Sequence, residues 1–125
     1  MSRPIKIKEF TDIFNIKESH LVLSKLYSQG YILTDGVNGF CWYKNGLMHR
    51  DNDKPAVIFP NNTKAWYKNG KIHRDGDKPA VMGVNGTKMW YKNGLLHRGG
   101  GKPAIILPSG TKEWWKNGQF IKDNF

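Results

Sequence analysis

The sequence predicts a mainly β fold: an extended antiparallel meander of 24-residue repeats, with a short helical cap at the N-terminus. The main observation is a tryptophan that recurs at a fixed step and opens near copies of one string, at Trp42, Trp66, Trp90 and Trp114. The second is that short apolar segments alternate with Asn-Gly or Ser-Gly pairs, which is typical of β-hairpins. The third is that residues 1–30 do not share the repeat.

The N-terminal segment has a helical apolar period. From Phe10 its apolar side chains follow the i, i+3, i+4 spacing of a helix, and we expect two short helices at about 8–15 and 17–29, the second ended by Gly30. Such a pair either forms a small helix-turn-helix that feeds a strand, as in winged DNA-binding domains, or covers the open end of the sheet. The cap is favoured because repeat arrays need an atypical terminal unit.

In the complete unit that begins at Trp66, the elements follow one another in a fixed order. Residues 80–84 predict an apolar strand, the Asn-Gly pair at 85–86 a two-residue hairpin turn, and residues 87–92 the returning strand. A second Asn-Gly pair at 93–94 predicts another tight turn. Asn-Gly suits a type I′ turn there because both central residues need positive φ.

Each unit also contains a polar loop that could carry chemistry. The string His-Arg-Asp-x-Asp begins at His49 and at His73, and imidazole with carboxylates is a common metal-binding or acid–base combination. The third copy, at His97, keeps His and Arg but has glycines in place of both carboxylates. A loop that persists without its acids is better explained as local structure, in which Asp bonds loop amides and Arg fixes the turn. We therefore predict no catalytic residue, no metal and no cofactor.

Length and composition narrow the class of protein. At 125 residues the chain fits a single domain, with residues 1–30 as the cap and 31–125 as the sheet. It has 20 Lys and Arg against 10 Asp and Glu, a net charge of +10, which favours nucleic acid, an anionic membrane or an acidic protein surface as partner. We recognise no membrane span and no signal peptide, and the lone Cys41 suggests a reducing compartment, so we expect a cytoplasmic protein.

The candidate binding residues are cations and tryptophans that recur in each unit. Strand alternation puts Lys64, Trp66 and Lys68 on one face. Such a face could stack exposed bases between cations; alternatively, the Trp is half-buried and the lysines lay their methylene stems on it. The candidate set is Lys64, Trp66, Lys68, Lys88, Trp90, Lys92, Lys112, Trp114, Lys116, Arg50, Arg74 and Arg98.

These residues resemble a known family. The pattern W-Y-K-N-G-x-x-H, then a strand and N-G-T-x-x-W, resembles the MORN repeat (membrane occupation and recognition nexus) over Val37–Gly118. The resemblance implies hairpins in an extended single-layer sheet. The longer string W-Y-K-N-G-x-x-H-R-D-x-D-x-P-A is similar to a MORN-variant repeat of bacteriophage and large DNA virus proteins, and related modules serve as bacterial antitoxins. Where the family usually has glycine after the histidine, this chain has Arg50, Arg74 or Arg98.

Together these features favour a binding protein over an enzyme. We expect a phage- or virus-type inhibitor that docks stoichiometrically on an acidic or nucleic-acid-loaded host complex, of a defence system such as CRISPR or a regulatory system, and blocks it. The expected partner is a host protein or ribonucleoprotein complex. Two alternatives stay open: a basic protein that binds nucleic acid through the Lys/Trp faces of the sheet, and a module that binds anionic lipid.

Overall fold

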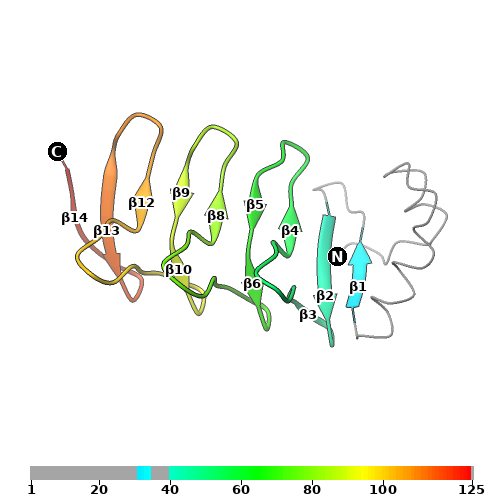
Figure 1. Ribbon diagram of the computed structural model, residues 1–125. Helices are drawn as coiled ribbons and strands as arrows, with labels where there is room; N and C mark the ends of the chain where they lie inside the picture. The colour runs from blue at the N-terminus through cyan, green and yellow to red at the C-terminus, as the bar shows by residue number, and fades with distance from the viewer. Residues whose placement is uncertain (1–30, 35–39, 125) are drawn as a thin grey trace.

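The computed structural model describes residues 31–34 and 40–124, with side chains described from Phe40 onward. Within these ranges the chain is mainly β, every strand pair is antiparallel and there is no helix, so the predicted β class is confirmed (Figure 1). No helix in this part of the chain is long and apolar enough to cross a bilayer. The predicted helical cap lies outside the described residues.

One ten-stranded sheet runs the length of the described chain, and its strands lie in nearly the same order in space as in sequence (Figure 1). In spatial order they are β1 (Tyr31–Thr34), β2 (Phe40–Lys44), β4 (Val57–Ile58), β5 (Lys64–Ala65), β8 (Val81–Met82), β9 (Lys88–Met89), β12 (Ile105–Ile106), β13 (Lys112–Lys116) and β14 (Gln119–Asp123), with β3 (Leu47–Met48) paired to β2. Two small hairpins lie beside it: β6 (Tyr67–Lys68) with β7 (Lys71–Ile72), and β10 (Tyr91–Lys92) with β11 (Leu95–Leu96).

The turns formed by the recurring Lys-Asn-Gly strings are type I′, as predicted. At Asn93 and Gly94 both central residues have positive φ, 50° and 86°, and the copies at 45–46, 69–70 and 117–118 share this conformation. The Gly94 N–H donates to the carbonyl of Ile72 in the preceding hairpin at 2.8 Å, and the same bond recurs one unit earlier and later. Each turn therefore holds its neighbour as well as closing its own hairpin.

The predicted two-residue turn at 85–86 is wrong. The Gly83 N–H donates to the Thr87 carbonyl at 2.9 Å and the Gly86 N–H returns to the Gly83 carbonyl at 3.1 Å, so three residues separate the strands. Of these only Gly86 is left-handed, with φ of 96°. This is a three-residue hairpin loop with a glycine bulge, and the Asn85 side chain favours it by accepting the Thr87 N–H at 3.1 Å.

The predicted returning strand at 87–92 is interrupted at Trp90, which divides it into β9 and β10. The Trp90 N–H donates to the carbonyl of Ala104 at 2.8 Å, and its own carbonyl accepts the His97 N–H at 3.0 Å. The chain thus changes hydrogen-bonding partner at the tryptophan, from the main sheet to the small hairpin. The same pair of bonds recurs at Trp42 and Trp66.

The core is a row of tryptophans and small residues rather than a sandwich between two layers. Trp66 and Trp90 are each 7% exposed, and the alanine that follows each loop proline is fully enclosed, as at Ala80. The bond from the Trp66 N–H to the Ala80 carbonyl, at 2.8 Å, brings the end of the polar loop back against its own tryptophan. This return fixes where the charged loop residues can lie.

Candidate functional site

One face of the sheet carries a row in which lysine and apolar side chains alternate from strand to strand. The register sets Lys64 opposite Met82, Met82 opposite Lys88, and so on across successive strands, and directly opposed residues share a face. We call this set the lysine row; its members are Ile58, Lys64, Met82, Lys88, Ile106 and Lys112. Its lysines are two strands apart, roughly 10 Å from one another.

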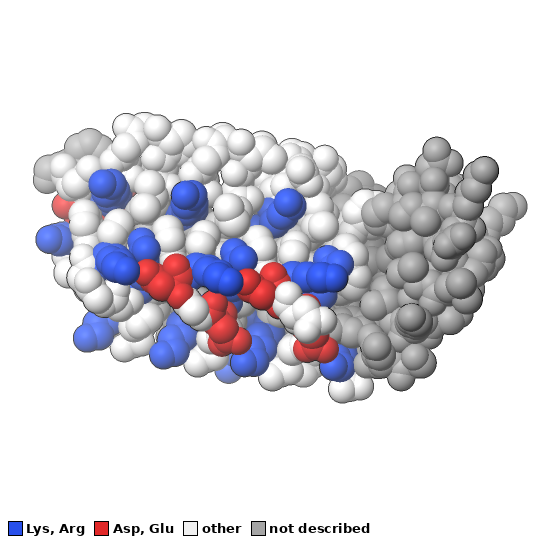
Figure 2. All heavy atoms as spheres, in the orientation of Figure 1, with Lys and Arg blue, Asp and Glu red and all other residues white. Residues whose placement is uncertain are grey.

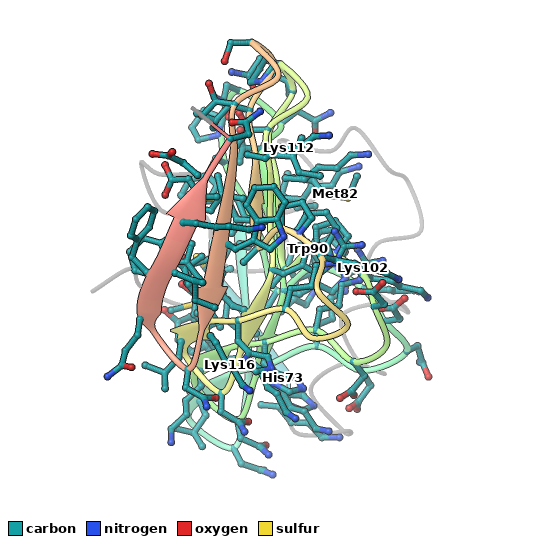
Figure 3. The ribbon with its side chains drawn as sticks, turned by 90° about the vertical axis from the view of Figure 1, so that its left-hand side faces the viewer. His73, Met82, Trp90, Lys102, Lys112 and Lys116 are labelled. Carbon is teal, nitrogen blue, oxygen red and sulfur yellow. The ribbon has the colours of Figure 1, made fainter. Side chains whose placement is uncertain are left out.

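The lysines of the lysine row are open to solvent. Lys88 and Lys112 are exposed, Lys64 is half-exposed, and Met82 between them is 36% exposed. In the part of the chain that the structure describes, the ammonium groups of these three lysines have no hydrogen-bond or ion-pair partner. Figure 3 shows Lys112 and Met82 on the same side of the sheet as Trp90 and Lys102. In Figure 2, the upper row of cations on this face has no carboxylate between its members.

The tryptophans proposed as stacking residues are covered by the protein itself. The guanidinium of Arg74 lies 3.8 Å from the Trp66 ring centroid, and the Trp66 Nε1–H donates to the Asp53 carbonyl at 3.1 Å. Arg98 covers Trp90 at the same distance. Even the more open Trp114 is only part-exposed. These rings hold the fold together, and the idea that Trp66 and Trp90 stack on nucleic-acid bases has to be corrected.

The arginines proposed for binding connect neighbouring units. Arg74 donates from Nε and Nη2 to the two carboxylate oxygens of Asp53, at 2.8 and 3.2 Å, and from Nη1 to the Pro79 carbonyl at 3.1 Å. Arg98 makes the same three contacts with Asp77 and Pro103, and Arg50 likewise stacks on its own tryptophan and donates to a loop carbonyl. Arg74 and Arg98 are only 13% and 14% exposed. The expectation that these Asp side chains bond loop amides is therefore wrong: they bond the arginine of the following unit.

These contacts change the acidity of the loop carboxylates. Hydrogen bonds from Arg74 and then Lys78 lower the pKa of Asp53 from 3.8 to about 2. The corresponding bonds from Arg98 and Lys102 hold the pKa of Asp77 well below its usual value. Both carboxylates therefore stay ionised at neutral pH, and each offsets part of the charge of its two cations. The lysine row has no such compensation.

The loop histidines are bridges within the fold. Nδ1 of His73 accepts the Asn93 N–H at 3.0 Å, so the proton sits on Nε2, which donates to Asp75 at 2.8 Å. Lys68 bonds the second oxygen of Asp75 at 3.3 Å, and the hydrogen bond from His73, then that from Lys68, lowers the pKa of Asp75. Among the described residues, no group of three or more His, Cys, Asp or Glu side chains could hold a metal ion.

The candidate set thus divides by environment. Lys64, Lys88 and Lys112 form the open row, Lys68 is paired with a carboxylate, and the arginines and tryptophans are internal contacts. Lys92 is exposed on the β10–β11 hairpin, and Lys116 is exposed at the end of β13 in the main sheet. Sequence reasoning missed Met82 and Ile106, which stand between the lysines. The sequence places both residues in the predicted apolar strands, but it does not give the register that sets Met82 opposite Lys64 and Ile106 opposite Lys88.

Two open clefts lie between successive loops. One, of about 540 Å³, is lined by the loops that contain His73 and His97. The other, of about 500 Å³, lies between the loops of His49 and His73. Their walls combine the Arg, Lys, Asp and His side chains already described with tryptophan and tyrosine, so charged and apolar atoms line both clefts, and neither is enclosed.

No family model, curated protein or solved structure matches the chain.

Proposed function

We propose that this chain is a non-enzymatic binding protein that docks its lysine row, stoichiometrically, on an acidic face of a host protein or ribonucleoprotein complex and obstructs that complex. The observation that carries the proposal is the row itself. Three lysines in register, roughly 10 Å apart, face solvent with no carboxylate partner in the described chain. Unpaired cations on a rigid sheet attract an acidic surface and set its orientation.

The apolar members of the row favour a protein partner over nucleic acid. Met82 is 36% exposed and stands directly between Lys64 and Lys88, so a docked surface meets apolar and cationic atoms in turn. Protein interfaces combine apolar contacts with charged ones, and methionine is enriched in them. A phosphodiester backbone presents mainly anionic oxygens and offers Met82 little apolar surface. Because Trp66 and Trp90 are covered by arginine, base stacking on them does not compensate.

The repeated contacts support a MORN-like repeat array as the scaffold for this row. Three kinds of hydrogen bond between neighbouring units recur at a 24-residue interval. The turn glycine bonds the preceding hairpin, the arginine bonds the preceding aspartate, and the histidine bonds the following asparagine. A rigid array of this kind presents its lysines at a constant interval. The resemblance to phage and viral repeats is the reason for placing the partner in a host cell.

The proposal is tested by capture of a partner under conditions that screen phosphate contacts. Tagged protein is incubated with nuclease-treated bacterial lysate at about 300 mM salt, where binding driven by phosphate contacts is largely lost. We expect a discrete protein partner at a fixed stoichiometry, and we expect Lys88→Glu to lose it. Lys71→Glu makes the same change in net charge at an exposed site outside the row and should retain the partner.

Two outcomes contradict the proposal. One is equal loss of the partner in Lys88→Glu and Lys71→Glu, because net charge rather than the lysine row would then control binding. The other is that no partner is captured while bare oligonucleotides bind at low salt with a steep salt dependence. That second result favours direct nucleic-acid binding.

A further inference from the structure

In two of the three loops a carboxylate joins a histidine to a lysine. The Asp75 carboxylate accepts from His73 Nε2 at 2.8 Å with one oxygen and from Lys68 Nζ at 3.3 Å with the other. In the preceding loop Asp51 makes the same bridge, to His49 at 2.7 Å and to Lys44 at 2.6 Å. In both loops a histidine and a lysine donate to one carboxylate, and the chain itself supplies that carboxylate.

The third loop keeps both donors but has no carboxylate of its own. Gly99 stands where the other loops have Asp51 and Asp75. Nδ1 of His97 still accepts the Asn117 N–H at 3.1 Å, so its Nε2 carries the proton and is a donor. Within the described residues, neither this Nε2 nor Lys92 Nζ has a partner.

Both donors line the 540 Å³ cleft, together with Gly99 and Gly100, so a group from outside can reach them. Five Lys and Arg side chains line the cleft against two carboxylates, which makes it attractive to an anion. The preceding loop shows which anion this pair of donors suits, because there the same two donor types hold the carboxylate of Asp75.

We propose that His97 and Lys92 bind a carboxylate of the partner protein, an Asp or Glu side chain, in the position that Asp75 occupies between His73 and Lys68. One oxygen accepts the His97 Nε2–H and the other accepts from Lys92. This inference rests on the proposed function, because it is the acidic surface of the docked partner that supplies the side chain. It adds one specific contact to the more diffuse attraction of the lysine row.

The site can be tested without the partner, with acetate as the probe. Sodium acetate replaces sodium chloride at constant ionic strength while the imidazole ¹⁵N shifts of the three loop histidines are followed by NMR. Two charge-assisted bonds to a small ion predict half-saturation on the order of 10 mM. We expect His97 to shift and saturate, whereas His49 and His73, already bonded to Asp51 and Asp75, stay unchanged.

Substitutions at the loop position give matched controls. Gly99 has no positive φ and no atom lies within 4 Å of an added Cβ, so the backbone accepts a side chain there. Gly99→Asp supplies the missing carboxylate and should weaken acetate binding at least about tenfold, whereas Gly99→Ala should leave it unchanged. Asp75→Gly is the reciprocal change and should make His73 respond to acetate.

A hexaglutamate peptide distinguishes a protein carboxylate from a free one. The peptide should half-saturate the His97 shift at a concentration at least about tenfold lower than acetate needs, because its further carboxylates reach neighbouring lysines. No saturable shift at His97, equal shifts at all three histidines, or an undiminished response in Gly99→Asp would overturn the site. Acetate binding without peptide binding would overturn the protein-carboxylate assignment. Loss of partner capture with the acetate response intact would instead count against the proposed function alone.

Discussion

Replacing Asp53 by asparagine should uncouple two neighbouring units. The Asp53 carboxylate accepts two bonds from Arg74, at 2.8 and 3.2 Å, and a third from Lys78 at 2.8 Å. An asparagine amide keeps one acceptor oxygen, but its NH₂ group would face donors instead of accepting from them. The paired, charge-assisted contact with Arg74 is therefore lost.

The size of the effect follows from the pKa of Asp53. Its fall from 3.8 to about 2 corresponds to an upper bound of roughly 2 kcal/mol of preferential interaction with the ionised form. The Asp53 side chain is 39% exposed, so solvent screening reduces this value, and we expect Asp53→Asn to lower the free energy of unfolding by about 1 kcal/mol at pH 7.

The sign of the pH dependence is also determined. Because folding lowers the pKa of Asp53, the contribution is fully present above about pH 4 and is lost as pH falls through about 2. The stability difference between wild type and Asp53→Asn should shrink to about half by pH 3.

Urea unfolding followed by tryptophan fluorescence measures this difference at pH 7 and pH 3. A double-mutant cycle with Arg74→Met isolates the pair and should give a coupling energy on the order of 1 kcal/mol at pH 7. A coupling energy near zero at pH 7, or one that does not fall at pH 3, would refute the assignment of Arg74 and Asp53 as a link between units.

Three further predictions concern the scaffold. Gly94→Ala should cost about 1 kcal/mol in unfolding free energy because Gly94 has φ of 86°, whereas Gly99→Ala should be neutral; similar costs in urea titrations would contradict the turn assignment. Trp66→Phe should lower the unfolding free energy by about 1 kcal/mol more than Trp90→Phe, because Trp66 Nε1 donates to a carbonyl whereas Trp90 Nε1 has no partner among the described residues; equal melting temperatures would argue against it. Elemental analysis should find no stoichiometric metal, and zinc or manganese that is lost in His73→Ala would disprove this.

Local chemistry allowed part of the fold to be predicted from sequence. The Asn-Gly pair at 93–94 forms a type I′ turn because few other residues tolerate positive φ twice in succession. The same pair at 85–86 gives a different loop, because the Asn85 side chain binds the Thr87 N–H and glycine alone turns left-handed. A dipeptide rule could not separate these cases, since the pair is Asn-Gly in both.

The candidate site was less predictable because its deciding contacts join residues far apart in sequence. Arg74 bonds Asp53 across 21 residues and covers the Trp66 ring, so two kinds of residue that looked available for binding are internal contacts. The lysines themselves could be identified from the sequence. Which of them keep an ammonium group without an ion-pair partner depends on where the loop carboxylates lie. The alternation with Met82 depends on strand register, which only the structure supplies.

The most direct test of the central claim, that the lysine row is the docking face, is a lysine footprint of the complex with its captured partner. Free protein and complex are treated with a limiting acetylating reagent, and the modification of each lysine is read by mass spectrometry. Lys64, Lys88 and Lys112 should each become several-fold less reactive in the complex, while Lys71 keeps its reactivity. Protection of Lys71 with the three row lysines unchanged would contradict the account.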